Sequence, residues 1–278
     1  MSIESKKLAI YYSWPSSVNG TFTVAGAINV FNDYHLLVLG TGLEDPSHGD
    51  HINTKDIIAG LSTNTKVYGY IDATLPLVDI QSKIDMWATI GVFGIFCDQF
   101  GYDFGLTRSK QNDIVDYIHL KNLSAFVNAW NPDDVFAPTD TLITHLGKKD
   151  WVLAESYQII NDNYQTNEDW INRSEKLAKY SAATGTKVAT VTTTLSGEYD
   201  QAKFDYAYFS ALLFGFDAVG WGEKDFSATS ALLPMRPRKR FFGNRYTSDI
   251  INNNGVLTRH TNVGIKVNTI TRTIDNLI

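Results

Sequence analysis

The chain has 278 residues, of which 44% are hydrophobic and 13% aromatic, and this content allows one large buried core. Charged residues make up 19% and the formal net charge is −6, so bulk electrostatics gives no indication of a nucleic-acid partner. The single cysteine, Cys97, excludes an intrachain disulfide framework. Its position inside an apolar run favours a small buried residue over a nucleophile.

The N-terminal stretch MSIESKKLAIYYSW contains no long apolar segment, so the sequence predicts no secretory signal. No stretch reaches the roughly 18 apolar residues of a membrane span, so we expect no membrane-spanning segment. Three localisations remain open: cytoplasmic, virion-associated, or extracellular after removal of a signal.

Eight apolar runs rich in Val, Ile, Tyr and Phe are predicted to be strands. In chain order they cover residues 7–14, 34–40, 66–73, 94–99, 124–130, 151–157, 187–194 and 218–223. Helical patterns separate them at residues 24–32, 53–62, 76–90, 108–121, 166–183 and 200–215, with weaker patterns at 133–146 and 227–234. Asn53 and Thr107 are predicted helix N-caps, and a glycine follows the end of the 166–183 pattern.

Strands of nearly continuous apolar character indicate a parallel sheet that is buried on both faces. Strand and helix alternate eight times, which predicts an α/β fold, a (β/α)8 TIM barrel. The alternative is an open doubly wound sheet, but no phosphate-cradling glycine fingerprint follows the first strand.

After about residue 236 the chain becomes polar and rich in Asn and Thr. We therefore predict a barrel domain over residues 1–243 and a short polar C-terminal extension over residues 244–278. Alternating runs such as residues 263–270 favour a β-ribbon, which could attach the chain to a larger assembly. The alternative is that these residues hold the last barrel helix and a C-terminal flap.

Polar residues at the strand ends are the candidate functional residues, because a TIM barrel carries its site at the C-terminal ends of its strands. Strands three to six end in Asp72, Asp98, Asn128 and Glu155. One such acid is explained by a cap or a turn. Acids on neighbouring strands, interleaved with aromatic residues, indicate a pocket instead. The further candidates for substrate binding at strand ends are Tyr12, Trp14, Gln99, Trp130, Tyr157, Trp221 and Glu223.

The chain has no HExxH motif, no pair of Cys or His with metal-ligand spacing and no GxSxG motif, so no metal and no cofactor are predicted. The stretch PSHGDH, residues 46–51, offers two histidines and an aspartate, but it favours a polar loop over a metal site. Two carboxylates at a barrel mouth suit glycoside cleavage. One protonates the leaving oxygen, and the other stabilises or attacks the sugar carbon. Aromatic rings supply flat surfaces for the sugar faces.

The stretch VYGYIDATLPLVDIQSKIDMWATIGVFGIFCDQ, residues 67–99, resembles the middle of spherulin-4-like glycoside hydrolases and their polygalactosaminidase relatives. The resemblance implies a (β/α)8 barrel that acts on microbial exopolysaccharides containing galactose and galactosamine. It also implies functional acids at the ends of the fourth and sixth strands and an Asn on the fifth. Asp98, Glu155 and Asn128 match these positions.

One position departs from the family pattern, which usually has Glu after the motif Asp where this chain has Gln99. If that Glu were the acid, Gln99 would abolish activity. If Asp98 and Glu155 form the catalytic pair, Gln99 instead hydrogen-bonds the substrate, and we favour this interpretation. Asn128 then helps to orient the sugar, and Asp72 supports the site or a subsite. The predicted aromatic platform is Trp130, Tyr157 and Trp221.

The sequence therefore predicts a glycoside hydrolase-like protein that cleaves a microbial surface polysaccharide or exopolysaccharide, with a polysaccharide or oligosaccharide as its partner. The alternative is a non-catalytic carbohydrate-binding or structural barrel of a virion appendage or cell-surface assembly. The absence of a signal and the polar C-terminal segment support this alternative. Fold alone does not choose between the two.

Overall fold

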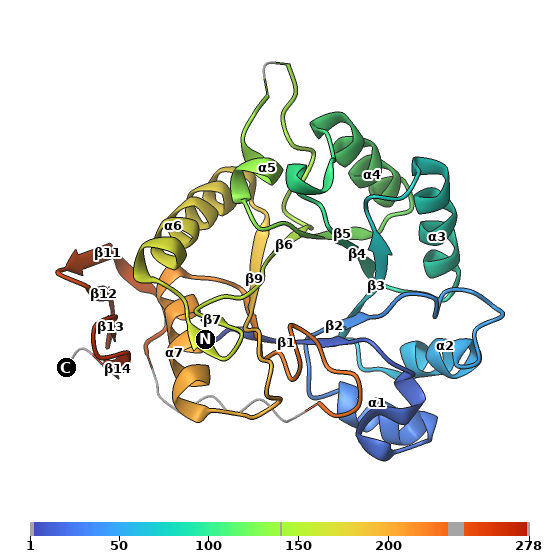
Figure 1. The fold of residues 1–278 in the computed structure, drawn as a ribbon, viewed down its shortest axis with the longest axis horizontal. Coiled ribbons are helices and arrows are strands. Elements are labelled where there is room, and N and C mark those ends of the chain that lie inside the picture. Colours follow the sequence, from blue (N-terminus) through green and yellow to red (C-terminus); the bar gives the residue numbers. More distant parts are fainter. Residues whose placement is uncertain (1–2, 140, 233–241, 277–278) are drawn as a thin grey trace.

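The protein is described by a computed structural model covering residues 3–139, 141–232 and 242–276. Its centre is a closed barrel of eight parallel strands in the order β1-β10-β9-β6-β5-β4-β3-β2 (Figure 1). The strands are β1 (Lys6–Tyr11), β2 (Leu36–Leu39), β3 (Lys66–Asp72), β4 (Gly94–Asp98), β5 (Ser124–Asn128), β6 (Trp151–Ala154), β9 (Lys187–Val191) and β10 (Ala218–Gly220). The prediction of a (β/α)8 barrel is confirmed, and the open sheet is excluded.

Helices surround the barrel, as the hydrophobic periodicity predicts (Figure 1). They are α1 (Val24–Phe31), α2 (His51–Gly60), α3 (Leu77–Thr89), α4 (Arg108–Leu120), α5 (Pro132–Phe136), α6 (Asn167–Thr184) and α7 (Gln201–Phe214), with two 3-10 turns, η1 (Pro15–Gly20) and η2 (Tyr102–Phe104). Both weaker helix predictions fail in part. Among the described residues of the region 133–146, the only helix is the short α5. Residues 227–232 form no helix, because Ala228 pairs with the end of β1 instead. Residues 233 and 234 lie outside the described ranges.

Two of the predicted helix boundaries agree with the structure, and one does not. The Thr107 hydroxyl accepts a hydrogen bond from the Lys110 backbone N–H, which confirms the N-cap of α4. Gly185, with φ of +77°, ends α6 in the left-handed conformation that favours glycine. The Asn53 cap is wrong, because α2 already begins at His51 and the Asn53 amide donates to the Asp50 carboxylate.

The barrel interior is filled by aromatic side chains, so it is a packed core and not a pore. Phe126 lies at its centre, with ring centroids 5.3 Å from Tyr68, 5.2 Å from Phe96 and 6.0 Å from Trp151. All four side chains are at most 3% exposed. The interior therefore leaves no room for a ligand, and a site on the barrel axis must lie at one of its ends.

Gly69 in β3 lets the Trp87 ring of α3 approach the strand closely. A Cβ atom at position 69 would lie 2.1 Å from the Trp87 ring. The indole N–H also donates to the Tyr70 carbonyl at 3.0 Å, so the ring cannot move away without losing this bond.

We expect Gly69→Ala to lower the free energy of unfolding by about 1–3 kcal/mol, because the added methyl group overpacks a fully buried contact. Urea denaturation measures the loss. Gly147→Ala is the matched control, since a Cβ atom there has no neighbour within 4 Å, and its effect should be small. Equal effects of the two substitutions would contradict this account.

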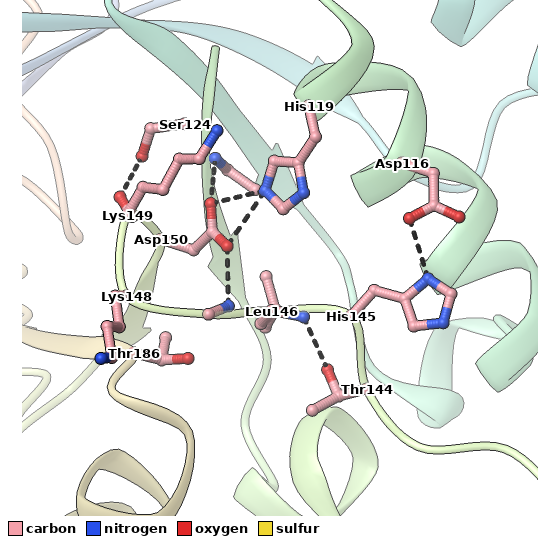
Figure 2. Close-up of polar contacts among 12 residues, drawn as sticks. Asp116, His119, Ser124, Thr144, His145, Leu146, Lys148, Lys149, Asp150 and Thr186 are labelled. Carbon is pink, nitrogen blue, oxygen red and sulfur yellow. Dashed lines mark hydrogen bonds and ion pairs between the residues drawn. The ribbon is translucent and has the colours of Figure 1, made fainter. Parts of the chain in front are cut away.

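At the N-terminal end of the barrel, the buried Asp150 carboxylate joins three segments of the chain (Figure 2). It accepts hydrogen bonds from the backbone N–H groups of Ala125 at 2.9 Å and Gly147 at 2.8 Å. His119 Nε2 lies 2.9 Å from the same carboxylate. Helix α4, the start of β5 and the loop before β6 are thus held together at the barrel end that serves stability in this fold.

The C-terminal residues form a four-stranded antiparallel sheet in the order β11 (Tyr246–Asn253), β12 (Val256–Thr261), β13 (Ile265–Asn268) and β14 (Thr273–Asn276). This sheet packs on α7, on the outside of the barrel (Figure 1). Every residue of α7 from Phe204 to Phe214 is buried, because the barrel covers one face and the sheet the other. The alternative that this segment contains the last barrel helix is wrong for the described residues 242–276.

Candidate active site

The structure brings four predicted residues to one end of the barrel. Asp72, Asp98 and Asn128 are the last residues of β3, β4 and β5, and Glu155 directly follows β6. These strands are parallel neighbours, so their C-terminal ends form one mouth.

Asn128 links the two candidate catalytic acids. Its side-chain nitrogen Nδ2 lies 2.9 Å from Asp98 Oδ1 and 2.8 Å from Glu155 Oε2. Two oxygens that share one amide nitrogen as donor lie within about 6 Å of each other. Asn128 is only 8% exposed, so this bridge is fixed in the base of the mouth.

The Asp98 carboxylate is held by two further donors. The Tyr70 hydroxyl donates to Oδ2 at 3.2 Å, and the Gln99 backbone N–H donates to Oδ1 at 2.9 Å. Gln99 has a φ of +56°, a left-handed conformation that turns the chain sharply at the end of β4. Burial and the neighbouring Asp98 raise the pKa of Tyr70, so its hydroxyl keeps the proton that it donates.

The surroundings of Glu155 alter its protonation. Burial raises the pKa of its carboxyl group, and the Asp98 charge raises it further, whereas the Asn128 hydrogen bond acts in the opposite direction. The net effect is upward, so Glu155 retains its proton to a higher pH than an exposed glutamate does.

A cavity of about 440 Å³ opens above these groups. It is lined by Asp98, Gln99, Asp103, Phe104, Asn128, Ala129, Trp130, Glu155 and Phe226. Asp103 and Phe104 come from η2, in the glycine- and aromatic-rich stretch after β4. Neither residue stands at a strand end, so the strand pattern does not predict them, and the glycine- and aromatic-rich composition is the available signal. No sequence signal marks Phe226, which comes from a short irregular segment after β10.

Two smaller pockets of about 240 Å³ are linked to the central cavity, one through a shared side chain and the other through a hydrogen bond. One includes Trp130, which also lines the central cavity, and the other includes Tyr70, which bonds Asp98. The first is lined by Trp130, Asn131, Pro132, Gln165, Asp169, Asn172, Arg173 and Lys176. The second is lined by Tyr12, Ser13, Trp14, Gly40, Thr41, Leu43, His48 and Tyr70.

Two of the aromatic candidates present open surface at the mouth. Trp14 is 51% exposed and Trp130 is 47% exposed, and they line different pockets. Tyr12 lies deeper, with its ring packed edge-on against Tyr70 and Phe226. Within the described residues its buried hydroxyl has no hydrogen-bond partner.

The prediction that Tyr157 belongs to the platform is wrong. Tyr157 is 1% exposed and packs against Trp170 and Phe216 on the helix side of the barrel. Strand β6 ends at Ala154, and Ser156 has a φ of +54°, so the chain turns and the Tyr157 side chain points away from the mouth.

Trp221 is also a wrong platform prediction. Its ring is 8% exposed and packs against Tyr199 and Phe204, because β10 ends at Gly220, just before it. Glu223 is partly buried and lies outside the residue sets that line the three pockets described above.

The Asp72 carboxylate stabilises the turn that directly follows β3. Its Oδ1 accepts hydrogen bonds from the Thr74 backbone N–H at 2.8 Å and the Thr74 hydroxyl at 2.6 Å. It neighbours Asp98 in the strand register but does not line the central cavity. Asp72 therefore fits the simpler explanation of an acid at a strand end, which is that its carboxylate stabilises the following turn.

The loop of residues 46–51 uses its polar groups within the fold. Asp50 accepts hydrogen bonds from the Ser16 N–H and hydroxyl, His51 contacts the Leu43 carbonyl, and the His48 ring packs against Trp14. Across the described ranges, no group of three or more His, Cys, Asp and Glu side chains is arranged to hold a metal ion. In the same ranges, no helix is long and apolar enough to cross a membrane.

Comparison with known proteins gives the fold alone. No family model and no curated protein matches the chain. Among solved structures, it is similar to the glycoside hydrolase domain of PelA from Pseudomonas aeruginosa, at 10% identity over 82% of this chain and 99% of that one, with a TM-score of 0.47. A carboxyl transferase domain of Rhizobium etli pyruvate carboxylase is 9% identical over 82% of this chain and 42% of that one, with a TM-score of 0.50.

An HpcH/HpaI aldolase from Desulfitobacterium hafniense DCB-2 is also similar, at 10% identity over 78% of this chain and 86% of that one, with a TM-score of 0.46. These enzymes differ in chemistry, so the likeness extends only to the architecture. The chain is a (β/α)8 barrel.

Proposed function

We propose that the protein is a glycoside hydrolase in which Asp98 and Glu155 are the reacting carboxylates. The observation that carries this proposal is the Asn128 bridge, which holds the two acids together at the base of the central cavity. Glycoside cleavage requires two carboxyl groups on either side of one glycosidic bond.

The environments of the two acids favour different roles. Glu155 acts as the general acid, because burial raises its pKa and keeps a proton available for the leaving oxygen. Asp98 acts as the nucleophile, because Tyr70, Gln99 and Asn128 hold its carboxylate in a fixed orientation.

The short separation favours retention of the anomeric configuration. Retaining enzymes place the two carboxyl groups about 5–5.5 Å apart, whereas inverting enzymes need about 6.5–9.5 Å to admit a water molecule. The shared donor on Asn128 limits the distance between one oxygen of each acid to about 6 Å, which supports the shorter spacing.

The shape of the mouth supports a chain-like substrate. Two smaller pockets accompany the central cavity, and each of these carries an exposed tryptophan, Trp14 or Trp130. Aromatic rings bind the apolar faces of sugar units. Together with the family resemblance, this supports a microbial polysaccharide of the galactose and galactosamine type.

The proposal is tested by incubating the protein with a panel of microbial exopolysaccharides and measuring new reducing ends. We expect release from at least one polymer, with NMR of the first products showing the retained anomer. If the protein binds polymers of the panel but releases no new reducing ends, the result would instead support a second candidate function.

The second candidate is a non-catalytic carbohydrate-binding barrel attached to a larger assembly through the C-terminal segment. Gln99 favours it, since the resembling families usually have Glu at this position and an amide cannot transfer a proton at neutral pH.

The raised pKa of Glu155 also predicts a pH-dependent stability effect. The folded protein binds this proton more tightly than the unfolded chain, so the contribution to stability is present at low pH and is lost as the pH rises through the folded pKa. At pH 7 this contribution is lost, so the buried carboxyl group of Glu155 lowers stability relative to low pH. Glu155→Gln removes this cost, and we expect it to melt at a higher temperature than the native protein at pH 7.

The gain should shrink as the pH is lowered to 4, and thermal melts at the two pH values measure it. Glu175→Gln, at an exposed position of α6, is the control and should change little at either pH. A gain from Glu155→Gln that is the same at both pH values would contradict the assignment.

A further inference from the structure

Arg173 of α6 lies between the proposed acid and the tryptophan beside it. Its Nη1 donates to the Glu155 backbone carbonyl at 2.7 Å. Its guanidinium carbon lies 4.5 Å from the centroid of the Trp130 ring, a cation–π distance. One side chain therefore contacts both the chain segment that carries Glu155 and the exposed ring that lines two of the pockets.

Fold stability alone does not explain this arginine. It is 7% exposed, and among the described residues no carboxylate lies within ion-pair distance of it. Its Nε and Nη2 atoms are buried and have no hydrogen-bond partner in the same residue set. Burial lowers the pKa of Arg173 to about 10, yet the group stays charged at neutral pH. A buried, unpaired charge opposes folding, and such groups concentrate at functional sites.

We propose that Arg173 is a positioning residue that couples Glu155 to Trp130. Its planar guanidinium fixes the Trp130 indole as a sugar-binding surface, and its charge and hydrogen bond set the protonation and position of Glu155. The inference rests on the proposed function, since it assigns a role within the same site. Lysine cannot replace it fully, because an ammonium group lacks the planar guanidinium that can stack on the Trp130 ring and donate a hydrogen bond to the Glu155 carbonyl at the same time.

The positive charge of Arg173 opposes the effect of the negative charges near Glu155. Asp98 on β4 and Asp225 after β10 both raise the pKa of Glu155, and Arg173 on α6 lowers it. Tyr12, directly after β1, also faces Glu155, and burial holds its hydroxyl in the neutral form. Asp103 on η2 lines the same cavity. Among these groups Arg173 supplies the positive charge.

The test compares Arg173→Met, which removes the charge and the stack, with Arg173→Lys, which keeps the charge and loses the flat fork. For Arg173→Met we expect the alkaline limb of the kcat profile to move to higher pH, because Glu155 keeps its proton longer. We expect Arg173→Lys to leave that limb in place. Both should raise KM by about fivefold through loss of the Trp130 stack.

Lys179→Met, on the exposed face of the same helix, is the matched control and should change neither quantity. In a double-mutant cycle, Trp130→Ala and Arg173→Lys should be non-additive in KM, because both remove the same stack. Arg173→Lys also tests the proposal if Arg173→Met fails to fold. An unchanged KM in Arg173→Lys, or an unchanged alkaline limb in a folded Arg173→Met, would overturn the proposal.

The same inference can be tested without catalysis, so its failure is distinct from failure of the proposed function. The chain has seven glutamates, and NMR of 13C-labelled Glu side chains, assigned with Glu155→Gln, follows the titration of Glu155 directly. Glu155 should titrate at higher pH in Arg173→Met than in the native protein. Identical titrations would overturn the role of Arg173 even if the enzyme is active. A shifted titration in a protein that cleaves no polymer would support the coupling and refute only the hydrolase.

Discussion

Asp98→Asn and Glu155→Gln are each expected to lower kcat by about 10³-fold or more on any polysaccharide that the native protein cleaves. Asparagine at position 98 cannot attack or stabilise the sugar carbon as a carboxylate does, and glutamine at position 155 cannot protonate the leaving oxygen. Both changes keep the shape of the side chain. Sugar binding should therefore persist, and neither variant should melt at a lower temperature than the native protein. Reducing-end assays with parallel binding and thermal-melt measurements check this.

Asp72→Asn is the control within the mouth, because the Asp72 carboxylate holds its own turn and does not line the central cavity. We expect it to change kcat by less than about tenfold. Gln99→Glu tests the opposite view. If this substitution creates turnover in a protein that is otherwise inert, the natural chain is a binder that has lost its acid, and Asp98 with Glu155 is not a sufficient pair.

Asp150→Ala is expected to cause the largest loss of stability, about 3–5 kcal/mol in the free energy of unfolding. The substitution leaves the backbone N–H groups of Ala125 and Gly147 and the ring of His119 without their acceptor at a buried position. Urea denaturation measures the loss.

Asp116→Ala is the matched control for this effect. Asp116 also binds a histidine, His145 (Figure 2), but the two side chains are 59% and 42% exposed. An exposed pair contributes about 0–1 kcal/mol, so its removal should cost far less than the loss of Asp150. Similar losses from the two substitutions would show that the buried hydrogen bonds of Asp150 are not what stabilises this end of the barrel.

The positions of Asp98, Asn128 and Glu155 at one mouth could be predicted from sequence because each follows directly from an apolar strand. Once the strands are parallel neighbours, their last residues must lie close together. The platform could not be predicted in the same way. Tyr157 and Trp221 are also close to strand ends, but their directions depend on the backbone turn that follows each strand, and hydrophobic periodicity carries no information about that turn.

Arg173 was missed for a related reason. It lies in the middle of a long amphipathic helix, where an arginine is ordinarily a solvated surface residue. Only the packing of α6 on the end of β6 places its guanidinium beneath Trp130. Whether a helix residue reaches the barrel mouth depends on tertiary packing, which the sequence pattern of the helix does not reveal.

The packing of the C-terminal sheet on α7 bears on how this protein could be engineered. The boundary that we propose after residue 243 separates two kinds of secondary structure, but the apolar packing continues across it, since Leu257, Ile265 and Val267 belong to the same buried cluster as α7. Tyr246 and Arg259 also bind the last carbonyls of that helix, at Leu212 and Leu213. A recombinant fragment that stops at the boundary would present a bare apolar helix to solvent. The portable unit for fusion or transplantation is therefore the barrel together with its sheet.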